Sequence, residues 1–203
     1  MDENNKDASK FIISKTHLQN WPSNRPTRTK KYLPSTKSET DYVVLDFETT
    51  GLRAGADQII QVGAVKYINH EQVDMMNLYV NPMRSISTRI TSLTGITNDS
   101  LKNKPPIYDV IPGLINFIGE LPIVAHNASF DMSFLYALDN FVKIPRYTVI
   151  DTLKLARQTI KQTPNHKLST LANYLQIEYH AHDALEDCLV TAKIYQYCLN
   201  QST

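Results

Sequence analysis

The sequence has few cysteines and no long apolar run, and both absences exclude classes of protein. Cys188 and Cys198 are the only cysteines. They stand ten residues apart in one expected helix, about 15 Å along its axis, which is too far for a disulfide. We interpret both as reduced packing residues. The longest apolar runs, such as 42–45, are short and residues 1–10 are polar, so we expect neither a membrane span nor a secretory signal, and a cytoplasmic location.

The composition is that of one soluble globular domain with a basic extension. The chain has 203 residues, 42% apolar and 20% charged, which excludes collagen-like, coiled-coil and acidic disordered proteins. Residues 1–40 hold eight Lys/Arg against four Asp/Glu, whereas residues 41–203 hold thirteen against sixteen. The first segment also holds Pro22, Pro26 and Pro34. We therefore expect residues 1–40 to be a flexible N-terminal extension and residues 41–203 to be the domain.

A second interpretation of the extension remains open. Its apolar residues, Phe11 to Ile13 and Trp21, could dock on the domain or on a partner, while its lysines contact a phosphate backbone.

Apolar periodicity and turn residues predict an α/β domain. We expect strands at 42–46, 58–67, 72–80, 121–125 and 148–150, and helices at 108–118, 130–138, 152–160, 168–175 and 183–199. Asp151 is the expected N-cap of the helix that follows it. The order predicts a mixed five-stranded sheet with helices on both faces. We find no internal repeat.

Acidic residues follow two of the expected strands. Asp46 and Glu48 end the first strand, where a period of two places both side chains on one face. The next residues, Thr49 to Gly51, form an expected turn whose N–H groups could face an anion, with a positive φ available to Gly51. Asp131 lies in the first turn of a helix that follows a buried strand. For each acid the alternative is structural, namely a solvated strand end or a helix terminus capped by Asn127 or Ser129.

The third acidic cluster lies at the start of the last expected helix. His182 precedes this helix, and Asp187 falls among apolar residues and is expected to face the protein, where a carboxylate needs a partner. Asp183 and Glu186 are assigned to the N-cap or the exposed face.

Together these clusters offer four carboxylates and one histidine. Hard oxygen ligands without cysteine suit two divalent ions, Mg²⁺ or Mn²⁺, which can promote phosphodiester displacement. Imidazole changes its protonation near neutral pH, so His182 is the natural general base.

These motifs resemble those of the DEDDh 3′–5′ exonucleases, the DnaQ-like superfamily of the proofreading epsilon subunit of bacterial DNA polymerase III. Residues 46–52 match the first motif, residues 126–131 the second, and His182 with Asp187 the third. The resemblance covers about residues 41–200. It implies a ribonuclease-H-like fold and metal-dependent release of 5′-mononucleotides from a 3′ end.

The resemblance also implies roles for individual residues. Asp46, Glu48 and Asp187 would bind the first metal, while Asp46 would also hold the second and Asp131 would support it. His182 would be the general base. Residues 93–96, Leu-Thr-Gly-Ile, resemble a segment of epsilon-type members that contacts the 3′-terminal base or sugar. The residues implied to bind the substrate, with Leu52 as an apolar wedge, are Thr49, Thr50, Gly51, Leu52, Leu93, Ile96, His126, Asn127, Phe130 and His182.

The expected substrate is single-stranded or frayed 3′ ends of DNA. The alternatives are an exoribonuclease similar to RNase T or oligoribonuclease, and a catalytically silent nucleic-acid-binding module. The match does not include the C-terminal region by which the epsilon subunit docks on its polymerase. We therefore expect, at most, loose recruitment to a polymerase or repair complex.

Overall fold

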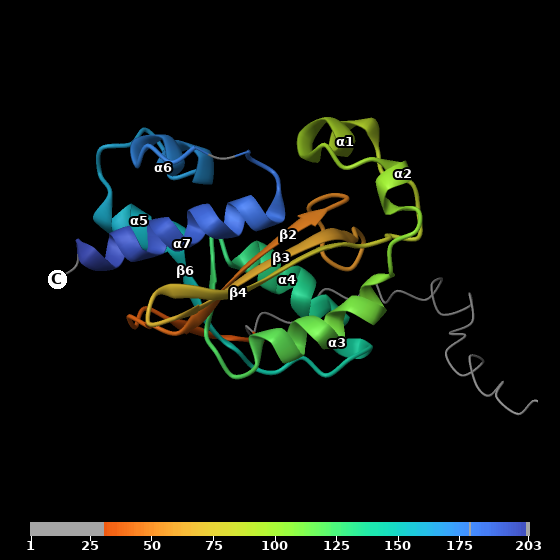
Figure 1. The fold of residues 1–203 in the computed structure, drawn as a ribbon, viewed down its shortest axis with the longest axis horizontal. Helices are drawn as coiled ribbons and strands as arrows, with labels where there is room; N and C mark the ends of the chain where they lie inside the picture. The colour runs from red at the N-terminus through yellow and green to blue at the C-terminus, as the bar shows by residue number, and fades with distance from the viewer. Residues whose placement is uncertain (1–30, 179, 202–203) are drawn as a thin grey trace, which may run out of the picture.

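Strand β2 (Tyr42–Thr49) is the centre of the fold in the computed structural model, because apolar residues bury both of its faces. The structure describes residues 31–178 and 180–201. The sheet order is β1-β6-β5-β2-β3-β4. Strands β1, β6, β5 and β2 run parallel, β3 is antiparallel to β2, and β4 is antiparallel to β3. The predicted mixed α/β architecture is confirmed, with a sheet of six strands rather than five. Figure 1 shows the helices packed around this sheet.

Most of the elements lie close to their predicted positions. The other strands are β1 (Leu33–Ser35), β3 (Ile59–Ile68), β4 (Glu71–Tyr79), β5 (Ile123–Ala125) and β6 (Thr148–Asp151). The helices are α1 (Thr88–Thr94), α2 (Asn98–Leu101), α3 (Ile107–Ile118), α4 (Ser129–Ala137), α5 (Thr152–Thr159), α6 (Leu168–Tyr174) and α7 (Ala184–Asn200), with a 3-10 turn, η2 (Leu138–Asn140). Among the described residues, no helix is long and apolar enough to cross a membrane.

Three short elements were not predicted. Strand β1 lies inside the segment assigned to the extension: it pairs with β6, and the Leu33 N–H donates to the Tyr147 carbonyl at 2.9 Å. Tyr32, just before β1, is buried in the core. The assignment of residues 31–40 to a flexible segment was therefore wrong, and residues 1–30 fall outside the described residues. Helices α1 and α2 were also missed, since elements this short show no periodicity.

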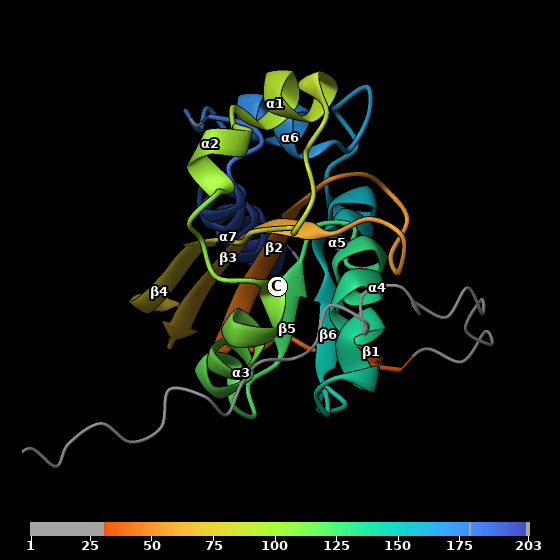
Figure 2. The same ribbon diagram turned by 90° about the vertical axis from the view of Figure 1, so that its right-hand side faces the viewer.

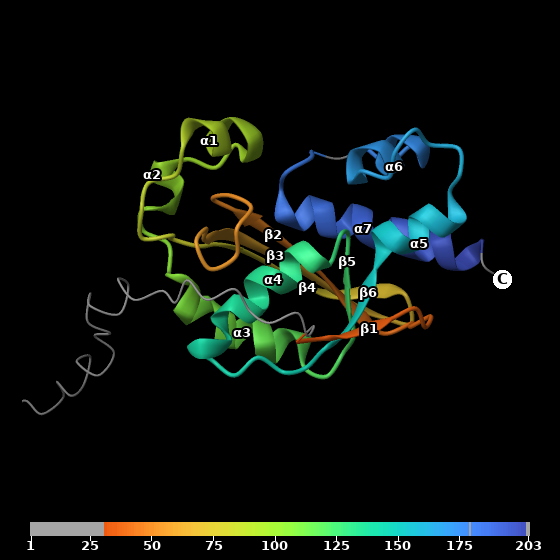
Figure 3. The ribbon, with the colours of Figure 1, turned by 180° about the vertical axis from the view of Figure 1, so that it is seen from behind.

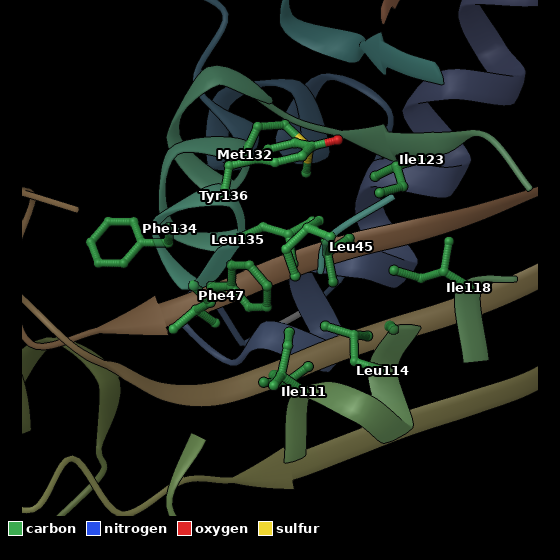
Figure 4. Close-up of a cluster of buried hydrophobic side chains, with 14 of the residues drawn as sticks. Leu45, Phe47, Ile111, Leu114, Ile118, Ile123, Met132, Phe134, Leu135 and Tyr136 are labelled. Atoms are coloured by element: carbon green, nitrogen blue, oxygen red, sulfur yellow. The ribbon is translucent and has the colours of Figure 1, made fainter. Parts of the chain in front are cut away.

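The two faces of the sheet hold different hydrophobic clusters. Along β2, Val43, Leu45 and Phe47 point toward α3 and α4, where they join the larger cluster (Figure 4). Tyr42 and Val44 point the other way and pack with residues of α7. Figure 2 and Figure 3 show α3 and α4 on one side of the sheet and α5 and α7 on the other. This alternation decides which side Asp46 and Glu48 face.

Helix α7 comes close to the sheet at Gly63 of β3. A Cβ at Gly63 would lie 2.3 Å from the backbone carbon and oxygen of Ala184, at the start of α7. Gly63 pairs in register with Asp46. The absence of a side chain here therefore brings the N-terminus of α7 against the strands that carry Asp46 and Glu48.

We predict that Gly63→Ala lowers the free energy of unfolding by about 2–4 kcal/mol, because either the helix or the strand must shift. Urea denaturation followed by circular dichroism measures the change. Gly113→Ala is the matched control, since Gly113 lies in α3 and a methyl group there would meet open space. That variant should gain about 0.5–1 kcal/mol. Equal effects of the two substitutions would contradict the close-approach argument.

Candidate active site

Asp46 and Glu48 lie on one face of β2, as their spacing predicted, and this face is the one that packs against α7. They alternate with Leu45 and Phe47, which enter the cluster on the opposite face. The pairing of β2 with β3 becomes irregular directly after Glu48. Both acids therefore sit where the central strand ends, on the side from which α7 approaches.

Asp131 reaches the same strand end from α4. Its side chain is buried, and its Oδ1 accepts a hydrogen bond from the Phe47 N–H at 3.2 Å. Strand β5 pairs with β2 only at Val43 and Val44, so this later N–H of β2 is available to a side chain. The expected capping of α4 by Asn127 or Ser129 is not observed, because the N-cap is Ala128 and no side chain caps the helix.

The start of α7 is fixed to β3 by a buried glutamine. Gln61 Nε2 donates to Asp183 Oδ2 at 3.0 Å, and Gln61 Oε1 accepts from the Ala184 N–H at 3.3 Å. Asp183 caps the helix, as expected, by accepting from the Leu185 and Glu186 N–H groups. These contacts place Asp187, in the first turn, against the acids of β2.

The third motif joins the acids of β2 in one cluster. Glu48, His182 and Asp187 each offer a ligand atom, and these atoms all lie within 4.8 Å of one another. His182 is exposed and has a left-handed backbone, with a φ of 68°. Such strain in a residue other than glycine is concentrated at functional sites.

Crowding and burial raise the pKa of all four carboxyl groups. Burial is the largest cause in each case. It raises the pKa of Glu48 to about 8, with Asp187 and Asp183 adding to the effect. It raises the pKa of Asp187 to about 7, although a backbone hydrogen bond with His182 opposes the shift. The pKa of Asp131 is raised to about 8, and that of Asp46 lies well above its usual range, partly because of Asp131 and Asp187.

This acidic set suits a divalent cation. In the described part of the chain, no lysine or arginine forms an ion pair with any of these four acids. Asp187 Oδ1 is buried and has no hydrogen-bond partner there. A buried, unpaired carboxylate oxygen is costly unless a cation compensates it. Carboxylate oxygens are ligands that suit magnesium or manganese.

The turn after β2 differs in part from expectation. Leu52 is 82% exposed, as a residue that meets a ligand should be. Gly51, however, does not have a positive φ. It is needed for space instead, because a Cβ there would lie 2.6 Å from the Asp57 carboxylate. The Thr50 N–H donates to the Gln58 carbonyl at 2.8 Å, so this N–H does not face an anion.

Two of the predicted substrate contacts have structural partners instead. Both ring nitrogens of His126 are engaged, Nδ1 with Thr152 Oγ1 and Nε2 with the His166 carbonyl, each at 2.9 Å. The Ile96 side chain is buried in the cluster that holds Ile60. These positions leave neither side chain open to a nucleotide in this conformation. Their predicted contact with the nucleotide stays a prediction, and the sequence does not show which internal groups these side chains meet.

The other predicted contacts keep accessible surface or lie beside the site. Leu93 is 49% exposed at the end of α1. Phe130 is partly buried and packs against Phe134, with ring centroids 5.1 Å apart. Asn127 is exposed, has a φ of 60°, and donates its N–H to Asp151 Oδ1 at 3.2 Å. The Thr49 hydroxyl donates to the Gly51 carbonyl at 2.6 Å.

Gln61 is a structural partner of the site that the sequence analysis missed. A signal was present, because Gln61 is the one polar residue of the run Ile59 to Val65 in β3. A polar side chain in a strand buried on both faces needs internal partners. The sequence could not show that these partners are Asp183 and the start of α7.

Comparison with known proteins agrees with this geometry. A family model described as exonuclease, of the RNase T type, matches residues 43–195. The chain belongs to the exonuclease family. It is 44% identical over 158 residues to a PolC-type DNA polymerase III of Bacillus subtilis, and 42% identical over 159 residues to that of Caldanaerobacter subterraneus. These matches cover 76% and 77% of the chain but only 11% of each relative.

Solved structures show the same fold. Exonuclease X in complex with 5′-overhanging duplex DNA is 29% identical, with a TM-score of 0.63, over 79% of this chain and 92% of that one. The nuclease domain of 3′hExo, a DEDDh family member bound to rAMP, is 22% identical, with a TM-score of 0.66, over the same shares of the two chains. These likenesses show the fold, which is the predicted ribonuclease-H-like fold.

The raised pKa values predict how stability without metal depends on pH. The pKa of Glu48 is about 8 in the folded state, against 4.5 for a free side chain. Protonated Glu48 therefore makes its full contribution to stability below the unfolded-state pKa of 4.5. This contribution is lost as the pH rises through the folded-state pKa of about 8. In EDTA, we expect Glu48→Gln to raise the free energy of unfolding by about 1–3 kcal/mol at pH 8.5 and by less at pH 5.5.

Thermal unfolding at the two pH values measures this difference, and a gain of 1 kcal/mol corresponds to about 2–4 °C for a domain of this size. Glu120→Gln is the control, because Glu120 is exposed and outside the site. A gain that is the same at both pH values would contradict the electrostatic explanation.

Proposed function

We propose that the protein is a metal-dependent 3′–5′ exonuclease that releases 5′-mononucleotides, mainly from single-stranded DNA. The observation that carries the proposal is the set Asp46, Glu48, Asp131 and Asp187, which meet at one strand end without a basic partner among the described residues. A protein that only bound nucleic acid would gain nothing from four repelling carboxylates beside a phosphate.

The roles implied by the resemblance fit these positions. Asp46, Glu48 and Asp187 would hold one divalent ion, and Asp46, with support from Asp131, would hold a second. When bound, such ions supply charge that offsets the phosphate and lower the pKa of water. Asp131 also holds the end of β2 through the Phe47 N–H, so it orients the strand that carries the other acids.

His182 would act as the general base. Its exposed imidazole lies beside Glu48 and Asp187 and takes a proton from the water that attacks the phosphorus atom. The bond between phosphorus and the 3′ oxygen breaks. The 3′ oxygen takes up a proton, and the strand keeps a new 3′-OH while the released nucleotide keeps its 5′-phosphate. The Thr49 to Leu52 turn would position the terminal nucleotide.

The relatives support DNA as the substrate, because those over 40% identical are PolC-type DNA polymerases III. The chain spans only 11% of their length. DNA as the substrate and a role in replication are therefore both part of the proposal. RNA is the alternative that the following test distinguishes.

Digestion of matched DNA and RNA oligonucleotides with a 5′ label tests the proposal. With Mg²⁺ or Mn²⁺ we expect a ladder that shortens from the 3′ end on DNA, and none in EDTA. Asp46→Ala and Asp187→Ala should each abolish turnover, whereas Glu120→Gln should retain it. A stronger ladder on RNA would assign the protein to RNA digestion, and full activity of either aspartate variant would overturn the mechanism.

His182→Ala tests the base separately. We expect the rate constant for cleavage to fall by about 10²–10⁴-fold, because general base catalysis contributes that much. Metal affinity, measured by calorimetry in the absence of substrate, should change little. If the affinity falls together with the rate, His182 is a metal ligand rather than the base.

A further inference from the structure

The turn between β4 and α1 holds an exposed methionine in a strained conformation. Met83 has a φ of 56°, in the left-handed region that favours glycine. Its side chain is 60% exposed, so core packing does not compensate for the strain. Strain of this kind is concentrated at functional sites, which makes Met83 a candidate for contact with a ligand.

A neighbouring side chain imposes this conformation. Asn81 Oδ1 accepts from the Met83 N–H at 2.8 Å, while Asn81 Nδ2 donates to the Lys102 carbonyl at 3.0 Å. The Asn81 N–H donates to the Pro105 carbonyl at 2.9 Å. The turn is therefore anchored to the segment between α2 and α3, and Met83 is held outward before any ligand arrives.

Arg84, the next residue, reaches the edge of the active site. Its Nη2 donates to Thr50 Oγ1 at 2.8 Å and lies 3.4 Å from Asp57 Oδ1. Thr50 follows Glu48 by two residues. The Arg84 side chain is 47% exposed. Within residues 31–178 and 180–201, no hydrogen bond uses its Nη1 or Nε, so donors remain for a ligand that approaches from solvent.

We propose that Met83 and Arg84 form a second contact surface for the DNA strand, outside the carboxylate site. Arg84 donates to a backbone phosphate, because a guanidinium suits the paired oxygens of a phosphate. Met83 offers apolar surface to a base, as the exposed Leu52 does on the neighbouring turn. Such contacts bind the strand independently of its sequence. This inference rests on the proposed nuclease function.

The negative charge of the domain explains why a basic residue at the edge of the site would help to bind DNA. Residues 41–203 carry thirteen basic against sixteen acidic side chains, and four of the acids lie in the site itself. A polyanionic strand that extends beyond the bound metal ions meets this negative charge. An arginine at the edge of the site offsets the repulsion for the next phosphate.

Steady-state kinetics of Arg84→Gln on two substrates tests the arginine. The p-nitrophenyl ester of thymidine 5′-monophosphate presents one nucleotide, whereas a ten-nucleotide dT oligomer extends beyond the site. We expect KM for the oligomer to rise by about 5- to 20-fold, which is 1–1.8 kcal/mol, and the loss on the oligomer to exceed that on the ester. The slope of log kcat/KM against log salt should weaken by about 0.7, the share of one phosphate of a single strand.

Arg146→Gln is the matched control. Arg146 is exposed and precedes β6, at the end of the sheet opposite the site, so its loss should leave the salt slope of the oligomer unchanged. An equal loss for Arg84→Gln on ester and oligomer would overturn the proposal, because Arg84 would then only support the Thr50 turn. If the unaltered protein cleaves neither substrate with metal, the proposed function itself fails.

Met83 is tested by two substitutions with opposite expectations. Met83→Gly suits the positive φ and removes the side chain, so we expect an equal or higher Tm but a KM for the oligomer about 3- to 10-fold higher. Met83→Leu keeps the apolar surface and should keep the KM. An unchanged KM in Met83→Gly would show that Met83 does not contact the strand.

Discussion

Repulsion among four carboxylates is the constraint on which the arrangement of the protein depends. Burial raises the pKa of Asp46, Glu48, Asp131 and Asp187, and neighbouring acids raise it further in each case. In isolation these side chains would move apart or take up protons. They stay together because each is attached to an element that hydrophobic packing fixes independently of the site.

Backbone geometry supplies the precision of the site. The period of β2 places Asp46 and Glu48 on one face, and the Phe47 N–H of the same strand donates a hydrogen bond to Asp131. The position of α7 depends on two features of β3, the missing side chain of Gly63 and the hydrogen bonds of Gln61. The acids thus come from one strand and from the first turns of two helices, and all of them are positioned against β2 and β3.

The parts of this arrangement that could be predicted are those encoded over short stretches of sequence. The buried strands, the N-caps Asp151 and Asp183, and the shared face of Asp46 and Glu48 follow from local patterns, and the structure bears them out. The spacing of the motifs also predicts which four acids gather at the candidate site.

The errors fall where a residue depends on a contact that no local pattern shows. Strand β1 has three residues and forms because β6 offers it an edge. Gly51 was expected to supply backbone freedom, whereas the Asp57 carboxylate requires the space. The internal partners of His126 and Ile96 are likewise not visible in a sequence pattern.

The hydrogen bond between the Gln61 side chain and the Ala184 N–H joins residues 123 positions apart, and it bears on how the protein is made. During synthesis, Asp46, Glu48 and Asp131 leave the ribosome well before α7. The incomplete chain lacks both Asp187 and His182, so the acidic cluster is complete only after the last helix has packed against the sheet.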